Sequence, residues 1–267
     1  MKKIFLLISI YCIFCLNFTF AEVISGKVDH NDMNYQNKIV DKKTNKPLSN
    51  AKISIPEIDY TTYSDKNGAF KLNADLNDKT VLFVEKEGYK VFSLTVDNSV
   101  IKGPLKLGIE QSSPFDLQIT QGVIHLGDNM FSSNSANSSD FKLNANGHFL
   151  SKKFKRPKAA QNQDIVVRIG TIIGLDTKKA KEQGQNRIAK VYSSPTEVFV
   201  NGKRIGVIEL NGDNIEILVP RHILKEDNEL VIKTGQNLFQ TEYVDYDDIE
   251  LANVRVETKE KHHFARH

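Results

Sequence analysis

The chain has 267 residues, of which 26% are charged, and it contains two cysteines and no tryptophan. Its formal net charge is +3, and removal of an expected signal segment holding Lys2 and Lys3 lowers it to +1 (3 − 2). This balance argues against nucleic acid or an anionic membrane as the main partner. A chain of this length can bury enough apolar surface for two domains.

Residues 1–21 predict a cleaved secretory signal. Two lysines are followed by an apolar stretch, and residues 19–21 have the small-x-small pattern of a cleavage site. The apolar stretch is short for a membrane span, so an uncleaved anchor is the less favoured alternative. Cys12 and Cys15 leave with the signal. We therefore expect a protein that is secreted, periplasmic or attached to the cell surface, with no membrane span after cleavage and no disulfides.

The expected first domain, residues 22–110, is a series of short strands. Ala51, Ile53 and Ile55 alternate with polar residues and therefore share one face. Ser64 to Gly68 supplies turn chemistry, because Asn-Gly favours positive φ. A second pair of strands flanks Glu87-Gly88. Short strands at this spacing predict a β-sandwich.

The segments "DKKTNKPLSNAKISIP", "TYSDKNGAFKL" and "VEKEGYKVFSLTV" resemble the carboxypeptidase regulatory-like domain, a transthyretin-like sandwich. The resemblance implies a non-catalytic accessory module of the kind common on secreted and cell-surface proteins. It does not imply a peptidase. A metallocarboxypeptidase holds zinc with His-x-x-Glu and a distant His, and no histidine of this chain has a glutamate three residues on.

The expected second domain, residues 113–257, begins after a boundary near Gln111 to Pro114. Its clearest hairpin surrounds Asn201-Gly202, a type I′ turn signal. A short helix is expected within residues 175–190. The segments "VFVNGKRIG", "VPRHILKEDNELVIKTG" and "DYDDIELANVRVE" resemble a galactose-binding-like jelly roll, found in carbohydrate-binding modules and in accessory domains of glycosidases. The expected fold class is thus all-β, with a prealbumin- or Ig-like sandwich, a jelly roll and a basic, histidine-containing tail (residues 258–267).

Four carboxylates precede or begin the expected last strand. They are Asp245, Asp247, Asp248 and Glu250. They could bind a structural calcium ion, the one cofactor we weigh, because Ca²⁺ takes six to eight oxygen ligands. A glycosidase acid pair is less favoured, since nothing indicates a cleft. The favoured interpretation is a solvated approach to the strand. The residues then expected to face the core, across a bulge at Ala252-Asn253, are Ile249, Leu251, Val254 and Val256.

Aromatic and amide side chains concentrate just before these acids, in residues 236–248. Flat rings can stack on sugar faces, as in other ligand sites. The absence of tryptophan weakens this hypothesis, and the segment could instead pack over the open end of a sandwich. The candidate ligand-binding residues are Tyr192, Phe239, Tyr243 and Tyr246.

Recognisable catalytic machinery is missing from the sequence. It has no Gly-x-Ser-x-Gly elbow, no phosphate-cradling glycine loop and no locally supported Ser/His/Asp order. We therefore expect a protein that is not an enzyme. The leading hypothesis is a binding protein of the cell envelope with a glycan as ligand. The alternative is a structural or assembly protein of the envelope that contacts other proteins.

Overall fold

The computed structural model describes six stretches of the chain. These are residues 37–77, 79–130, 141, 143–185, 192–239 and 241–261. Within them nearly every element is a strand and the two α-helices are short, which confirms the all-β prediction. The expected signal (residues 1–21) and the histidines of the tail lie outside the described residues. No helix in the described stretches is long and apolar enough to cross a membrane.

Two sheets form a first sandwich. One has the strand order β4-β1-β7, with β1 and β7 parallel, and the other has the order β3-β2-β5-β6. The strands are β1 (Asn37–Asp41), β2 (Lys52–Ile55), β3 (Tyr60–Tyr63), β4 (Ala69–Phe70), β5 (Thr80–Glu85), β6 (Phe92–Val96) and β7 (Lys106–Ile109). A 3₁₀ turn, η1 (Pro56–Ile58), and a short helix, α1 (Asn98–Ile101), connect them. Fully buried side chains such as Ile39, Ile53 and Leu82 make the core.

Two further sheets form a second sandwich. One has the order β14-β11-β16-β8, with β9 also paired to β16, and the other has the order β10-β15-β12-β13. The strands are β8 (Leu117–Gln118), β9 (Val123–Leu126), β10 (Phe149–Lys155), β11 (Gln163–Ile173), β12 (Thr196–Val200), β13 (Lys203–Ile208), β14 (Gly212–Leu218), β15 (Asp227–Lys233) and β16 (Ile249–Glu260). A short helix, α2 (Lys178–Glu182), and a 3₁₀ turn, η2 (Arg221–Ile223), complete it. β16 thus takes in the first residues of the segment expected to be a tail.

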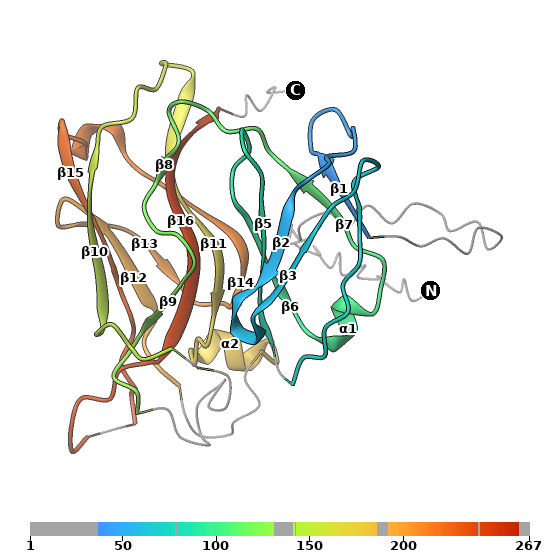
Figure 1. Ribbon diagram of the computed structural model, residues 1–267. Helices are drawn as coiled ribbons and strands as arrows, with labels where there is room; N and C mark the ends of the chain where they lie inside the picture. The colour runs from blue at the N-terminus through green and yellow to red at the C-terminus, as the bar shows by residue number, and fades with distance from the viewer. Residues whose placement is uncertain are drawn as a thin grey trace, which may run out of the picture.

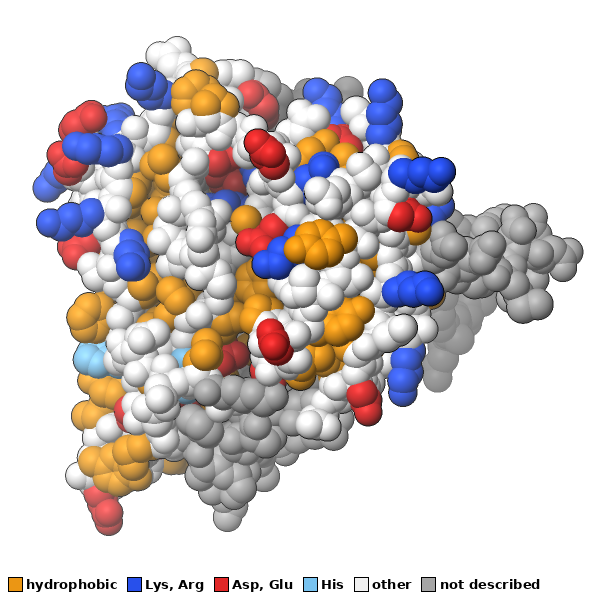
Figure 2. All heavy atoms as spheres, in the orientation of Figure 1, with side chains coloured by type: hydrophobic (Ala, Val, Ile, Leu, Met, Phe, Trp, Pro, Cys, Tyr) orange, Lys and Arg blue, Asp and Glu red, His pale blue; other side chains and the backbone are white. Residues whose placement is uncertain are grey.

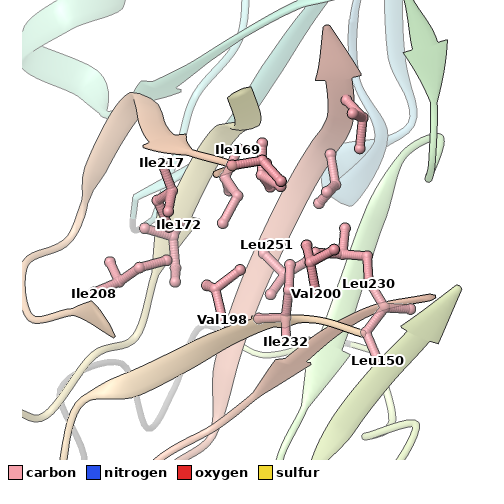
Figure 3. Close-up of a cluster of buried hydrophobic side chains, with 14 of the residues drawn as sticks. Leu150, Ile169, Ile172, Val198, Val200, Ile208, Ile217, Leu230, Ile232 and Leu251 are labelled. Carbon is pink, nitrogen blue, oxygen red and sulfur yellow. The ribbon is translucent and has the colours of Figure 1, made fainter. Parts of the chain in front are cut away.

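The core of the second sandwich lies between its two sheets. Figure 3 shows Val198 and Ile232 of one sheet pointing toward Leu251 of the other. All four residues expected to face inward from the last strand belong to this cluster, which confirms that prediction. Full burial of an aliphatic side chain is worth about 1.5–3 kcal/mol, so this cluster is a main source of stability.

The two central strands change face at the same point. In β11 every second residue faces the core as far as Ile169, and the next residue to face it is Ile172, three positions on. β16 has the same three-residue step between Leu251 and Val254. Between them Asn253 has a positive φ of 59°, and Gly170 lies opposite it. Such a conformation shifts the alternation of a strand by one residue. The predicted irregularity at Ala252-Asn253 is therefore present and is shared with the neighbouring strand.

The two sandwiches lie face to face. Figure 1 shows β16 and β11 between the strands of the outer sheet on one side and β5, β2 and β6 on the other. β6 contacts β11, β14 and β16, and a small apolar cluster unites Val81 and Phe83 with Ile173 and Ala252. β11 and β16 are therefore buried on both faces, which explains the unbroken burial of residues 165–173 and 249–257.

Gly170 allows this close approach, so we expect Gly170→Ala to destabilise the protein. A β-carbon at this position would lie 2.2 Å from Ser93 Oγ of the first sandwich and 2.8 Å from the β-carbon of Asn253. Overpacking of this kind costs about 1–3 kcal/mol. Urea denaturation measures the loss. Gly212→Ala is the matched control, since nothing lies within 4 Å of its β-carbon. If Gly170→Ala were as stable as Gly212→Ala, the close contact between Gly170 and Ser93 would be contradicted.

Candidate functional site

The predicted aromatic segment forms a loop that projects from one end of the second sandwich. We call residues 236–246, without residue 240, the aromatic loop. At its base Gln236 pairs with Tyr246, and the Asn237 amide donates to the Asp245 carbonyl over 2.8 Å. The Leu238 amide donates to the carbonyl of Tyr192 over 3.1 Å. Backbone hydrogen bonds therefore fix the base of the loop against the neighbouring segment.

The tip of the aromatic loop exposes apolar side chains. Leu238, Phe239 and Val244 are each more than half exposed, and Tyr243 is nearly so. Figure 2 shows hydrophobic side chains and a histidine along the lower left edge of the molecule. Isolated exposed apolar residues are ordinary. Four of them on one projecting loop are typical of a surface that binds a ligand or another protein.

Two ring pairs include three of the four predicted aromatic residues. Tyr192 and Phe239 meet edge to face, with their centroids 4.5 Å apart. Tyr246 stacks on His148, a residue that the sequence did not single out, with centroids 4.3 Å apart and planes 13° apart. Tyr192 and Tyr246 are half-buried, whereas Phe239 and Tyr243 face solvent. The loop therefore combines a packed base with an exposed tip. It shares features with both alternatives from the sequence, a ligand-binding segment and a segment packed over the end of a sandwich.

The acids at the start of the last strand are not solvated, and that expectation was wrong. Asp247, Asp248 and Glu250 are buried, while Asp245 is half-buried. Asp248 Oδ1 lies 2.7 Å from His125 Nε2 and also accepts the Asn129 amide. These acids are buried because the strand carries them beneath loops whose donors are distant in the sequence.

His125 is the partner that sequence reasoning missed. It is fully buried, and its Nδ1 lies 2.5 Å from the carbonyl oxygen of Leu143. Its ring also stacks on Phe141. Burial acts to lower the pKa of His125, but hydrogen bonds to Asp248 and Leu143 outweigh burial and raise the pKa above its usual value. With an acceptor at each nitrogen, the geometry favours an imidazolium.

The other acids have different partners. Asp247 accepts the Asp176 amide over 3.2 Å, and burial together with the Asp176 carboxylate raises the pKa of Asp247 well above its usual value. Asp245 accepts a side-chain hydrogen bond from Asn237. Among the described residues no three His, Cys, Asp or Glu side chains form a group that could hold a metal ion. The calcium site therefore gains no support from this geometry and stays a prediction.

A buried ionic cluster joins the two sandwiches, and the sequence did not reveal it. We give this name to Lys90, Arg168, Arg255 and Glu257. Glu257, 1% exposed, lies 3.1 Å from Lys90 Nζ and contacts Arg168 and Arg255. Burial acts to raise the pKa of Glu257, but Arg168 and Lys90 outweigh it and hold the pKa below its usual value. Glu257 is therefore a charged anchor between the sandwiches.

Further hydrogen bonds extend this contact to β6 and to Val91, the residue before it. Asn253 and Arg255 both donate to the carbonyl of Val91, over 2.7 and 2.6 Å. The amide and the hydroxyl of Thr95 donate to Asp213. Two hollows of 130 and 140 Å³ lie beside these bonds. Ligand pockets usually measure about 300–1,000 Å³, so neither hollow is large enough for a sugar chain.

Comparison with known families identifies the first sandwich. Residues 36–113 match the CarboxypepD_reg-like domain, and this range contains β1 to β7. The resemblance predicted for the first domain is therefore confirmed. No curated protein matches the chain. The galactose-binding-like resemblance of the second sandwich stays a prediction.

Solved structures show weaker likeness. The chain is similar to BuGH86wt in complex with neoagarooctaose, with a TM-score of 0.30 and 14% identity, over 82% of this chain and 27% of that one. It is also similar to dimeric latent PorU from Porphyromonas gingivalis, with a TM-score of 0.24 and 11% identity, over 79% of this chain and 22% of that one. The chain spans about a quarter of the length of these proteins. Similarity at this level identifies no function.

Proposed function

We propose that this is a non-catalytic binding protein of the cell envelope, and that the tip of the aromatic loop binds a glycan. The observation that supports the proposal is the exposure of Phe239 and Tyr243 on a loop whose base is fixed by hydrogen bonds. The CarboxypepD_reg-like sandwich and the export signal predicted at residues 1–21 agree with an accessory role outside the cytoplasm.

The loop suits a sugar for physical reasons. A pyranose ring has an apolar face that can lie against an aromatic ring, while its hydroxyl groups need hydrogen-bond partners at the edge. Phe239 is held by the ring of Tyr192 and by its amide, which donates to the Asn237 side chain over 2.9 Å. A platform that is already ordered binds with a smaller entropy loss than a free loop does.

We expect Phe239→Ala and Tyr243→Ala each to weaken glycan binding by about two- to tenfold. Loss of one ring contact costs on the order of 0.5–1.5 kcal/mol. The measurement is affinity electrophoresis of the exported chain in gels that contain soluble polysaccharides. Tyr63→Ala is the matched control, because Tyr63 is similarly exposed but belongs to the first sandwich. The proposal fails if no polysaccharide retards the protein, or if the control variant loses as much affinity as the loop variants.

Protein–protein contact is a second candidate function, favoured by Leu238 and Val244. These aliphatic side chains are 58% and 55% exposed and cannot stack on a sugar. Exposed aliphatic and aromatic groups together are typical of protein interfaces. Cross-linking in the envelope fraction distinguishes the two functions. A partner that is lost in Leu238→Ser/Val244→Ser, with polysaccharide binding absent throughout, would favour assembly over glycan binding.

A further inference from the structure

Two acids of the aromatic loop and one next to it carry negative charge. We call Asp128, Glu242 and Asp245 the acidic rim. Asp128 Oδ2 accepts the amide of Tyr246 over 2.9 Å, and Asp245 Oδ2 accepts the side-chain amide of Asn237 over 3.0 Å. Both carboxylates are half-buried, and Glu242 is exposed at the tip. Glu242 and Asp245 thus lie within the exposed part of the loop sequence, next to Tyr243 and Val244, and Asp128 contacts the end of the loop.

Two lysines of the described chain lie close to the aromatic loop, Lys181 beside its rings and Lys233 at the end of β15, shortly before Gln236. Lys181 Nζ lies 5.9 Å from the centroid of the Tyr192 ring. The other lysines of α2, Lys178 and Lys179, are paired with Glu182 and Glu209. The three carboxylates of the acidic rim therefore outnumber the two described lysines beside the loop. A surface of this kind repels polyanions, and the repulsion is strongest at low ionic strength.

We infer that the aromatic loop selects uncharged glycans and rejects sulfated or uronate-rich ones. This inference rests on the proposed glycan binding and adds the ligand class. Ionised carboxylates only accept hydrogen bonds, and the hydroxyl groups of a neutral sugar donate them. A sulfate or uronate group brings further acceptors and a like charge, so it would have to lose water without gaining a partner. The rings supply the stacking contact, and the acidic rim supplies the discrimination.

Matched pairs of polymers test the inference. The exported chain is titrated by affinity electrophoresis against neutral polysaccharides with different backbones, including laminarin, hydroxyethyl cellulose and dextran, and against a sulfated derivative of each. We expect at least one neutral polymer to bind at least tenfold more tightly than its sulfated form at low salt. The ratio should shrink in 0.5 M NaCl, because salt screens the repulsion.

Charge-removal variants identify the source of the selectivity. Glu242→Gln/Asp245→Asn should lower the ratio of neutral to sulfated affinity by about fivefold at low salt, because it removes the repulsion of the sulfate groups. Glu87→Gln/Glu226→Gln removes as much charge from exposed sites elsewhere and should leave both affinities unchanged. Equal or tighter binding of the sulfated form to the unaltered protein overturns the inference while the proposed function stands. Absence of binding to every polymer overturns both.

Discussion

Replacement of Glu257 by alanine is expected to lower the free energy of unfolding by about 3–5 kcal/mol. The side chain of Glu257 lies between Lys90 of the first sandwich and the guanidinium groups of Arg168 and Arg255 in the second. Its removal takes away the carboxylate that pairs with Arg255 and one of the carboxylates that pair with Lys90 and Arg168, and the low dielectric of the interface makes this costly. A loss of this size is a large part of the stability of an ordinary domain.

Urea denaturation followed by far-ultraviolet circular dichroism measures the change. Glu197→Ala is the matched control, because Glu197 pairs with Arg204 over 2.7 Å at an exposed position where an ion pair is worth less than about 1 kcal/mol. Because Glu257 joins the sandwiches, its variant should also lose coupling between them and unfold over a broader or two-step transition. A variant as stable as the control would show that the ionic cluster contributes little.

Local features of the fold were predictable because their causes are local. The Asn201-Gly202 signal predicts a type I′ turn, and both residues have positive φ, 52° and 75°. The short helix expected within residues 175–190 is present as α2, which begins after Thr177, whose side chain accepts the Ala180 amide. Turn and cap chemistry acts over a few residues, so the sequence contains all of the information.

The burial of the other face of β16, which points toward the first sandwich, could not be predicted in the same way. Arg255 and Glu257 are charged, and charged residues opposite an apolar face indicate a solvated surface. They are buried instead, because the first sandwich covers that face. Lys90 and Glu257 are 167 positions apart in the chain. No periodicity within one strand reveals a partner at that distance.

In the candidate site, too, local features could be predicted from the sequence and long-range contacts could not. The sequence placed the aromatic loop correctly next to the last strand, since composition marks it. It interpreted the acids before the strand, Asp248 among them, as a solvated approach, because acids are rarely buried without partners. The partner of Asp248 is His125, 123 positions away, and a lone histidine carries no signal of such a pairing. Burial of a carboxylate is therefore decided by a distant donor, which only the folded chain brings near.

We expect His125→Gln to cost about 3 kcal/mol at pH 5.5 and clearly less at pH 8.5. His125 lies between Asp248 and the carbonyl of Leu143, and the charge of Glu250 also favours its protonated form. The pKa of His125 is raised in the folded protein, so the folded state binds the proton more tightly than the unfolded chain does. This stabilisation is complete below about pH 6.5 and is lost as the pH rises through the raised folded-state pKa. Glutamine keeps a donor for Asp248 but gains no proton.

Urea denaturation at pH 5.5, 7.0 and 8.5 gives the free energy of unfolding of the unaltered protein and of His125→Gln. The difference between the two free energies isolates the contribution of His125. The stability of the unaltered protein alone would not isolate it. Burial also raises the pKa of Asp247, and the ionisation of Asp247 destabilises the fold as the pH rises. His222→Gln, at an exposed position, should show no such difference at any pH. A stability difference for His125→Gln that stays constant or grows toward pH 8.5 would mean that His125 is neutral when buried. In that case the pair with Asp248 would be an ordinary hydrogen bond, and the loops above the last strand would be held independently of pH.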